Sequence, residues 1–187
     1  MQLCRQRGIW YPNRLRHGRS TTEPAGSRLA SATHDGHNGP RTTSKYQPIA
    51  DHGLIGDLQT AALVGLDGKI SWVCSPRFDS PSVFASLLDA ENGGHFQLTC
   101  ADENAVVKQL YSVDTAILIT RYLTSEGVGE VIDFMPVENP ETASNKHLIV
   151  RIARVVRGTV KFKLECAPRF DYGRIDHQLE LQDHHAL

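Results

Sequence analysis

The residues best suited to chemistry in this sequence lie between Trp72 and Asp79. Trp72 offers an aromatic face that can stack on a sugar ring, and Arg77 and Asp79 can share hydrogen bonds with adjacent hydroxyls. Structural roles remain open for all three. A large aromatic side chain in an alternating strand usually buries its area, and Arg77 can equally pair with Asp79. The segment therefore predicts a candidate functional surface, with burial of Trp72 and internal pairing of Arg77 with Asp79 as the alternative.

The carboxylates near predicted loops are dispersed along the chain, namely Asp51, Asp57, Asp79, Asp133 and Asp171. Acid–base hydrolysis needs two carboxyl groups held in a fixed relation, and the sequence alone pairs none of these. Asp next to Gly, Ser or Pro usually accepts backbone N–H groups in a turn, so structural work is the expected role of Asp67 and Asp79.

Metal and cofactor motifs are missing from the sequence. The nine histidines include no H-E-x-x-H spacing, and the four cysteines form no C-x-x-C pair. There is also no P-loop, no Gly-rich dinucleotide turn and no serine nucleophile elbow. We therefore predict no metal and no cofactor. The thiols of Cys74, Cys100 and Cys166 lie in alternating segments, which predicts buried free cysteines and fits a reducing compartment.

The chain has 187 residues and a net charge of −1, with 20 basic and 21 acidic side chains. This balance predicts no binding to nucleic acid, and no apolar run approaches the roughly 18 residues of a membrane span, which predicts no membrane partner. Residues 1–45 differ from the rest, with eight basic and two acidic groups, a balance of 8 − 2 = +6.

The basic tail, residues 1–45, is rich in Ser, Thr, Gly and Pro, and its large apolar residues follow no strand or helix period. We expect it to be disordered. Such a tail resembles an organelle transit peptide, but it is equally what an upstream, mis-assigned start codon produces, and the latter is preferred. No apolar stretch suited to a secretory signal lies near Met1, so we expect a cytoplasmic protein.

From residue 46 onward the chain reads as short alternating segments separated by turn residues, which predicts an all-β antiparallel domain. Asp67-Gly68 joins two strand-like runs, 60–66 and 69–75, and predicts a hairpin with a type I′ turn. Ser80-Pro81 predicts the start of a short helix through Leu88. Further strands are expected over 95–100, 106–113, 114–124, 130–137, 147–157, 160–166 and 175–182. About eight strands and one short helix predict a β-sandwich.

Five ordered landmarks carry a resemblance to a known family, and they lie at 48–57, 60–64, 67–84, 133–136 and 168–173. They include Pro76-Arg-Phe-Asp-Ser-Pro-Ser-Val-Phe84 and Pro168-Arg-Phe-Asp-Tyr-Gly173. These segments resemble the amino-terminal domain of bacterial and archaeal glucoamylase and trehalase-like enzymes of glycoside hydrolase family fifteen. The resemblance covers residue 46 to the end.

The resemblance implies a two-domain enzyme, in which a super-β-sandwich precedes a helical barrel that holds two catalytic glutamates. One glutamate acts as general acid and the other as general base, with inversion. The barrel lies beyond residue 187, so this chain is expected to be inactive alone, incomplete at its carboxyl end, and partnered by the missing barrel and an α-glucoside. The resemblance adds the segment between His52 and Asp57 to the candidates for the rim of the sugar pocket.

Two alternatives to this interpretation remain. The chain is either an independent carbohydrate-binding β-module, which predicts sugar affinity without hydrolysis, or an inactive fragment of a truncated gene. The second alternative predicts an exposed apolar face and aggregation.

Overall fold

The computed structural model describes residues 46–137, 147–178 and 180. The predicted disordered tail, residues 1–45, lies outside them. Within the described part the chain forms ten strands and two short 3-10 turns, η1 (Ile49–Asp51) and η2 (Asp171–Gly173). The strands are β1 His52–Gly56, β2 Ala61–Gly65, β3 Lys69–Cys74, β4 Ser82–Phe84, β5 His95–Cys100, β6 Val106–Tyr111, β7 Leu118–Leu123, β8 Gly127–Phe134, β9 Val150–Gly158 and β10 Phe162–Ala167.

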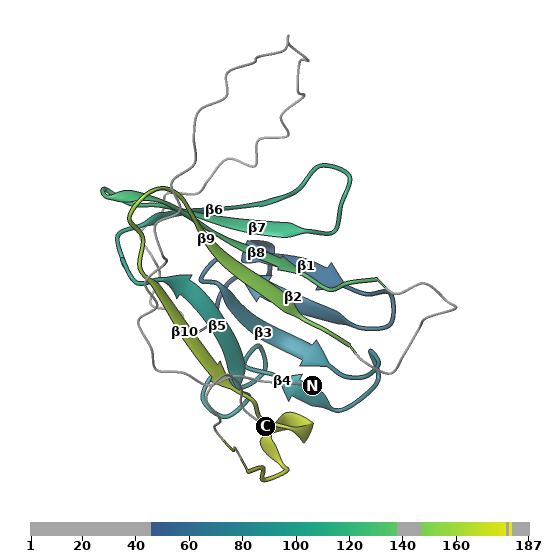
Figure 1. The fold of residues 1–187 in the computed structure, drawn as a ribbon. Coiled ribbons are helices and arrows are strands. Elements are labelled where there is room, and N and C mark those ends of the chain that lie inside the picture. The colour runs from purple at the N-terminus through teal and green to yellow at the C-terminus, as the bar shows by residue number, and fades with distance from the viewer. Residues whose placement is uncertain (1–45, 138–146, 179, 181–187) are drawn as a thin grey trace.

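The ten strands form two antiparallel sheets that lie face to face (Figure 1). One sheet has the order β1-β2-β3-β5-β10, with β4 paired to the end of β3, and the other has the order β6-β7-β8-β9. The chain crosses between the sheets after β5 and again after β9. The predicted antiparallel sandwich is confirmed.

The core lies between the two sheets because alternate side chains of each strand point inward. Its largest fully buried members include Tyr122, Phe84, Ile55, Ile70 and Leu118. Cys74, Cys100 and Cys166 are buried free cysteines, as predicted. Cys4 lies outside the described residues.

An ion pair between the neighbouring strands β8 and β9 lies in this core. The Nε of Arg151 lies 2.8 Å from Oδ1 of Asp133, and both side chains are almost fully buried. The same guanidinium donates to the carbonyl oxygens of Phe96 and Gly68 in the opposite sheet and lies 4.9 Å from the centre of the Phe96 ring. A buried guanidinium needs a counter-charge and hydrogen-bond acceptors for its N–H groups. Arg151 therefore both neutralises Asp133 and links β9 to the facing sheet.

A single hydroxyl pairs with the middle residue of β1 at the outer edge of the sheet. The backbone N–H of Leu54 donates to the Tyr111 hydroxyl at 2.7 Å, and that hydroxyl donates to the Leu54 carbonyl oxygen at 2.9 Å. Tyr111 ends β6 in the other sheet, so this contact also joins the two layers at their edge.

The hairpin between β2 and β3 forms where predicted, but its turn differs. Gly68 has a φ of +73°, whereas Asp67 is not among the residues with positive φ, so the turn is not type I′. The Gly68 N–H donates to the Gly65 carbonyl oxygen at 2.9 Å, which places Leu66 and Asp67 at the centre of the turn. A glycine with positive φ after such a turn is the usual three-residue hairpin with a bulge.

The helix predicted from Ser80 to Leu88 is wrong. Ser82, Val83 and Phe84 are all buried and form β4, which pairs with β3 through Val73 and Cys74. A strand satisfies this short apolar run because it buries both faces at once, which one helical turn with a single apolar face does not do. Beyond β4 the chain only turns, and Ala85 N–H donates to the Gly93 carbonyl oxygen.

The strand predicted over 175–182 is also wrong for its described part. Residues 175–178 are exposed and pair with no strand, and residues 179 and 181–187 lie outside the described ones. Asp171, Tyr172 and Gly173 all have positive φ, and this turns the chain away from the sheet after β10. No helix in the described part of the chain is long and apolar enough to cross a membrane.

Candidate functional site

Two loops meet beside β4, and we call them together the β4 loops. The first is residues 75–81, between β3 and β4, and the second is residues 168–174, after β10. Arg169 N–H donates to the Val83 carbonyl oxygen at 3.0 Å, and Tyr172 N–H donates to Ser82 Oγ at 3.0 Å. These two bonds attach the second loop to the short strand that the first loop precedes.

An aromatic and cationic stack lies on the second loop. The Tyr172 ring lies 6.1 Å from the Trp72 ring, centre to centre, at an interplanar angle of 45°. The Arg174 guanidinium lies 5.5 Å from the Tyr172 ring centre, and its Nη2 donates to Asp171 Oδ1 at 2.7 Å. Trp72 is half-buried by this arrangement, whereas Tyr172 is exposed. The exposed Tyr172 ring therefore contacts the tilted Trp72 ring and has the Arg174 guanidinium over its face.

The backbone beneath this stack is strained. Asp171 and Tyr172 have φ values of +50° and +59°, a region that non-glycine residues seldom adopt, and Gly173 follows at +80°. Such strain persists only where surrounding contacts enforce it, and it is common at binding sites. Here the contacts that enforce it are the Tyr172–Ser82 hydrogen bond and the Arg174–Asp171 pair.

The first loop carries Arg77 and Asp79, whose side chains pair with each other at 3.1 Å. The alternative of internal pairing is therefore the observed arrangement. Both side chains are more than two-thirds exposed, and Phe78 between them is also exposed. Arg77, Phe78 and Asp79 thus present a guanidinium, an apolar ring and a carboxylate to solvent from one turn.

Asp57 does structural work at the same end of the sheet. Its Oδ1 accepts the N–H groups of Gln59 and Thr60, and its Oδ2 lies 2.6 Å from Nδ1 of His147, in the chain segment that leads into β9. Burial would raise the pKa of the Asp57 carboxyl, but the hydrogen bonds from His147, Thr60 and Gln59 outweigh burial and lower it. With 7% of the residue exposed, Asp57 is not available to a ligand at the surface.

His52 lies apart from the β4 loops. It begins β1, whereas Asp57 directly follows β1, so the two residues are separated by the length of the strand, about 15 Å. Its Nδ1 lies 3.0 Å from the Pro48 carbonyl oxygen. The structure therefore brings Trp72, Arg77 and Asp79 to one end of the sheet and leaves His52 at the other.

Sequence reasoning overlooked Tyr172 and Arg174 as site residues. A signal was present, because the tetrapeptide Pro-Arg-Phe-Asp occurs twice, at 76–79 and at 168–171. Both copies lie in the β4 loops. Asp67 behaves as predicted, since its Oδ1 accepts the Lys69 N–H in the hairpin turn.

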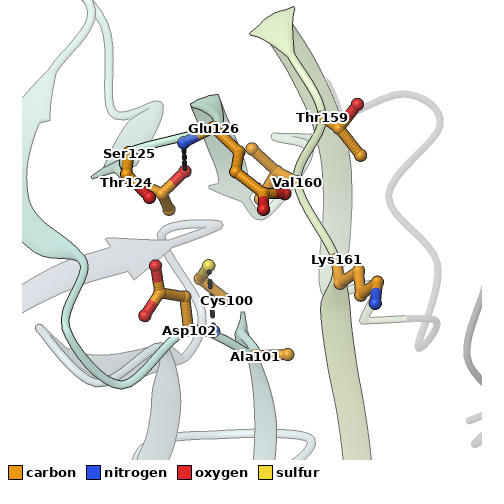
Figure 2. Close-up of a pocket in the computed structure, with 9 residues that line it drawn as sticks. All are labelled: Cys100, Ala101, Asp102, Thr124, Ser125, Glu126, Thr159, Val160 and Lys161. Carbon is orange, nitrogen blue, oxygen red and sulfur yellow. Dashed lines mark hydrogen bonds between the residues drawn. The ribbon is translucent and has the colours of Figure 1, made fainter.

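A separate hollow opens at the opposite end of the sandwich (Figure 2). It is lined by the connections β5–β6, β7–β8 and β9–β10, with Asp102, Glu126 and Lys161 as its charged side chains. Its volume of about 240 Å³ is below the usual range of ligand pockets, and no aromatic side chain lines it. Among the described residues, no group of three or more His, Cys, Asp or Glu side chains could hold a metal ion.

The two facing sheets and the β4 loops define the chain as an antiparallel β-sandwich domain with an aromatic and charged surface at one end. Residues 42–186 match the family model described as "Trehalase-like, N-terminal", and the chain belongs to this family.

Relatives named trehalase align with most of this chain. The trehalase of Mycolicibacterium smegmatis is 33% identical over 151 residues, which cover 73% of this chain and 22% of that protein. The trehalase of Mycobacterium tuberculosis is 31% identical over 144 residues, covering 70% of this chain and 21% of that protein. The trehalase of Thermoplasma volcanium is 33% identical over 154 residues, covering 76% and 23%. This chain therefore spans about a fifth of the length of these relatives. No solved structure gives a significant match.

Proposed function

We propose that this chain is the amino-terminal, non-catalytic β-domain of a glycoside hydrolase of family fifteen that acts on α-glucosides, with trehalose as the first candidate. The observation that carries the proposal is the match of residues 42–186 to the trehalase-like amino-terminal family, supported by relatives named trehalase. The α-1,4/1,6-glucans of glucoamylases are the alternative substrates of the parent enzyme.

The use of the carboxylates supports a non-catalytic role. Inverting hydrolysis needs a carboxylic acid and a carboxylate about 6.5–9.5 Å apart, both directed at the sugar. In the described part of this domain four of the five candidate carboxylates, all but Asp51, have a cationic or imidazole partner: Asp57 with His147, Asp79 with Arg77, Asp133 with Arg151 and Asp171 with Arg174. The catalytic pair is therefore assigned to a downstream helical barrel.

Within this proposal, the β4 loops lie at the rim of the barrel's sugar pocket. Exposed Phe78 and Tyr172 offer faces for a sugar ring, and Arg77, Asp79 and Arg174 offer hydrogen bonds to hydroxyls. His52 and Asp57, the other rim candidates, receive less support because Asp57 is buried and His52 lies at the far end of β1.

The size of the native product tests the proposal. An antibody against residues 46–187 should detect a product several times larger than 20.7 kDa in the source cells, in keeping with the length of the relatives. That product should release glucose from trehalose, and the purified 187-residue chain should not. A stable native product near 20.7 kDa would contradict the proposal.

The exposed rings of the β4 loops also favour a second candidate, an independent carbohydrate-binding module. Calorimetric titration of the 187-residue chain with trehalose and maltooligosaccharides distinguishes the two. Heat that disappears in a Tyr172→Ala variant would support the module. The absence of heat at millimolar sugar would remove it.

A further inference from the structure

The outer face of the four-stranded sheet, which we call the β6–β9 face, is built from straight rows of aliphatic side chains. One row crosses all four strands in register, as Leu110, Ile119, Ile132 and Ile152. A second row, four residues away along β6, β7 and β8, contains Val106, Leu123 and Val128 and ends at Arg157. An outer face in contact with water normally alternates to polar residues, so these rows depart from the usual pattern of a two-layer sandwich.

A charged row lies between the two aliphatic rows. Lys108, Arg121, Glu130 and Arg154 face one another in register across the four strands. Arg121 and Arg154 each hold one oxygen of Glu130 at 2.6–2.7 Å. Burial would raise the pKa of the Glu130 carboxyl, but the hydrogen bonds of the two arginines outweigh burial and lower it.

The two arginines cover Glu130 and remain exposed themselves. Glu130 has 1% of its side chain exposed, whereas Arg121 and Arg154 have 44% and 56% exposed. Both arginines contact Glu130 through Nε and Nη2. Their Nη1 groups make no hydrogen bond or ion pair within the described part of the chain, so each half-exposed arginine keeps a charged donor for a further partner.

Exposed hydrophobic side chains gather on this sheet, on both sides of the charged row. Val106, Leu110, Leu123, Ile152 and Val156 are exposed large hydrophobic side chains on this one sheet. Exposed apolar side chains gathered on one face mark an interface with another protein surface, and arginine is enriched in such interfaces. The β6–β9 face therefore has the composition of a docking surface.

The charge of the face selects an acidic partner. Its rows carry four cations, Lys108, Arg121, Arg154 and Arg157, against the single carboxylate of Glu130, a balance of 4 − 1 = +3. Residues 1–45, with their balance of +6, are repelled by this face. A second copy of the chain packed face to face would bring two such cationic rows together, which is equally unfavourable.

We propose that the β6–β9 face binds the remainder of a trehalase-like parent chain, through a surface that is apolar and carries carboxylates opposite Arg121 and Arg154. This inference rests on the proposed function. The length of the relatives supports this occupant, because about four-fifths of each relative lies outside the segment that matches this chain.

Binding in trans tests the proposal. The probe is the Mycolicibacterium smegmatis trehalase lacking the 151-residue segment matched here, first shown to be folded by a single cooperative melt. The 187-residue chain should bind this probe in a sedimentation or biolayer experiment. Ile152→Glu and Leu110→Glu, which place a charge on exposed positions of the aliphatic row, should weaken binding about tenfold or more.

A charge variant and a matched control complete the design. Arg157→Glu should weaken binding and reduce its dependence on salt, because it removes one cation from the face. Lys163→Glu changes charge equally but lies on the outer face of the other sheet, so it should bind like the original chain. All variants should melt within a few degrees of the original chain, since each position is exposed.

The outcomes separate the two proposals. If the face variants and Lys163→Glu change the affinity of the complex equally, or not at all, the docking face is overturned and the proposed function stands. The absence of any complex with the original chain, together with a native product near 20.7 kDa, would overturn both. The absence of a complex alongside a much larger native product would overturn the docking face alone.

Discussion

Asp133 and Glu130 lie three residues apart on β8, and their side chains point to opposite faces of the same sheet. Both carboxylates are almost completely buried and both are paired with arginine. Asp133 has one buried arginine, Arg151, whose remaining donors reach backbone carbonyls of the facing sheet. Glu130 has two arginines, which remain largely exposed.

The difference separates an internal cross-link from a surface network. The Asp133–Arg151 pair is buried, so no water can replace a lost partner. Removing one partner therefore leaves the other charge buried without compensation. The Glu130 network lies at a surface, where water and salt can substitute for each arginine. The first network should therefore dominate folding stability, and the second should matter mainly for what approaches the β6–β9 face.

The largest expected effect comes from Arg151→Met. The substitution leaves Asp133 buried without a cation and frees the carbonyl oxygens of Phe96 and Gly68, so the free energy of unfolding should fall by about 3–5 kcal/mol. Urea denaturation of the 187-residue chain measures it. Arg151→Lys keeps the charge and should lose less. Equal losses in the two variants would show that charge is not what Asp133 requires.

Gly68→Val should cause the next largest loss of stability, because it displaces the Gly68 carbonyl oxygen that accepts a hydrogen bond from Arg151. A Cβ at Gly68 would lie 2.2 Å from the Leu98 carbonyl oxygen and 2.7 Å from the Tyr122 hydroxyl, and the φ of +73° disfavours a β-branched residue. We expect a loss of about 2–4 kcal/mol. An unchanged melting temperature would contradict the turn geometry.

Asp57→Asn tests a third pair, which connects the end of β1 to the segment before β9. The folded pKa of Asp57 is lowered, so its contribution to stability is present above the unfolded value of 3.8 and is lost as the pH falls through the folded value. The variant should lose about 1–3 kcal/mol at neutral pH. Denaturation curves from pH 7 to pH 3 should show a shallower acid-side decline than in the original chain, and parallel curves would contradict this assignment.

Glu130→Gln should cost less, about 1 kcal/mol, because its arginine partners are open to solvent. Thermal melts at low and high salt measure the difference. Added salt should lower the melting temperature of the original chain by screening the Glu130 ion pairs, and it should lower that of the variant less. A loss as large as that of Arg151→Met would remove the distinction between the two networks.

Arg77→Ala should have the smallest effect, within about 0.5 kcal/mol, because the Arg77–Asp79 pair is exposed on both sides. The measurement is again the thermal melt. A clear loss of stability would indicate that the first of the β4 loops supports the fold rather than a ligand.

The fold class could be predicted from the sequence because alternation and turn residues are local signals. The strand β4 could not be predicted, because three consecutive buried residues show no two-residue alternation. These residues form a strand only because they pair with β3. The segment after β10 alternates like a strand, yet the left-handed turn at Asp171 and Tyr172 removes it from the sheet.

The candidate site was only partly predictable for the same reason. Arg77 and Asp79 are neighbours in sequence, so their pairing could be weighed in advance. Partners far apart could not be foreseen: His147 lies 90 residues from Asp57, and Tyr172 meets Trp72 only because the second of the β4 loops returns to β4. The repeated Pro-Arg-Phe-Asp tetrapeptide was the one sequence feature shared by the two β4 loops.

The hydroxyl of Tyr111 has a consequence for how this domain behaves at high concentration. It occupies both the donor and the acceptor that Leu54 would otherwise offer at the open side of β1. An incoming strand from another molecule therefore finds the middle of β1 already hydrogen-bonded. Loss of that oxygen atom, as in Tyr111→Phe, would leave both backbone groups of Leu54 free to pair with a strand of another molecule, so the Tyr111 hydroxyl should lower the tendency of β1 to associate between molecules.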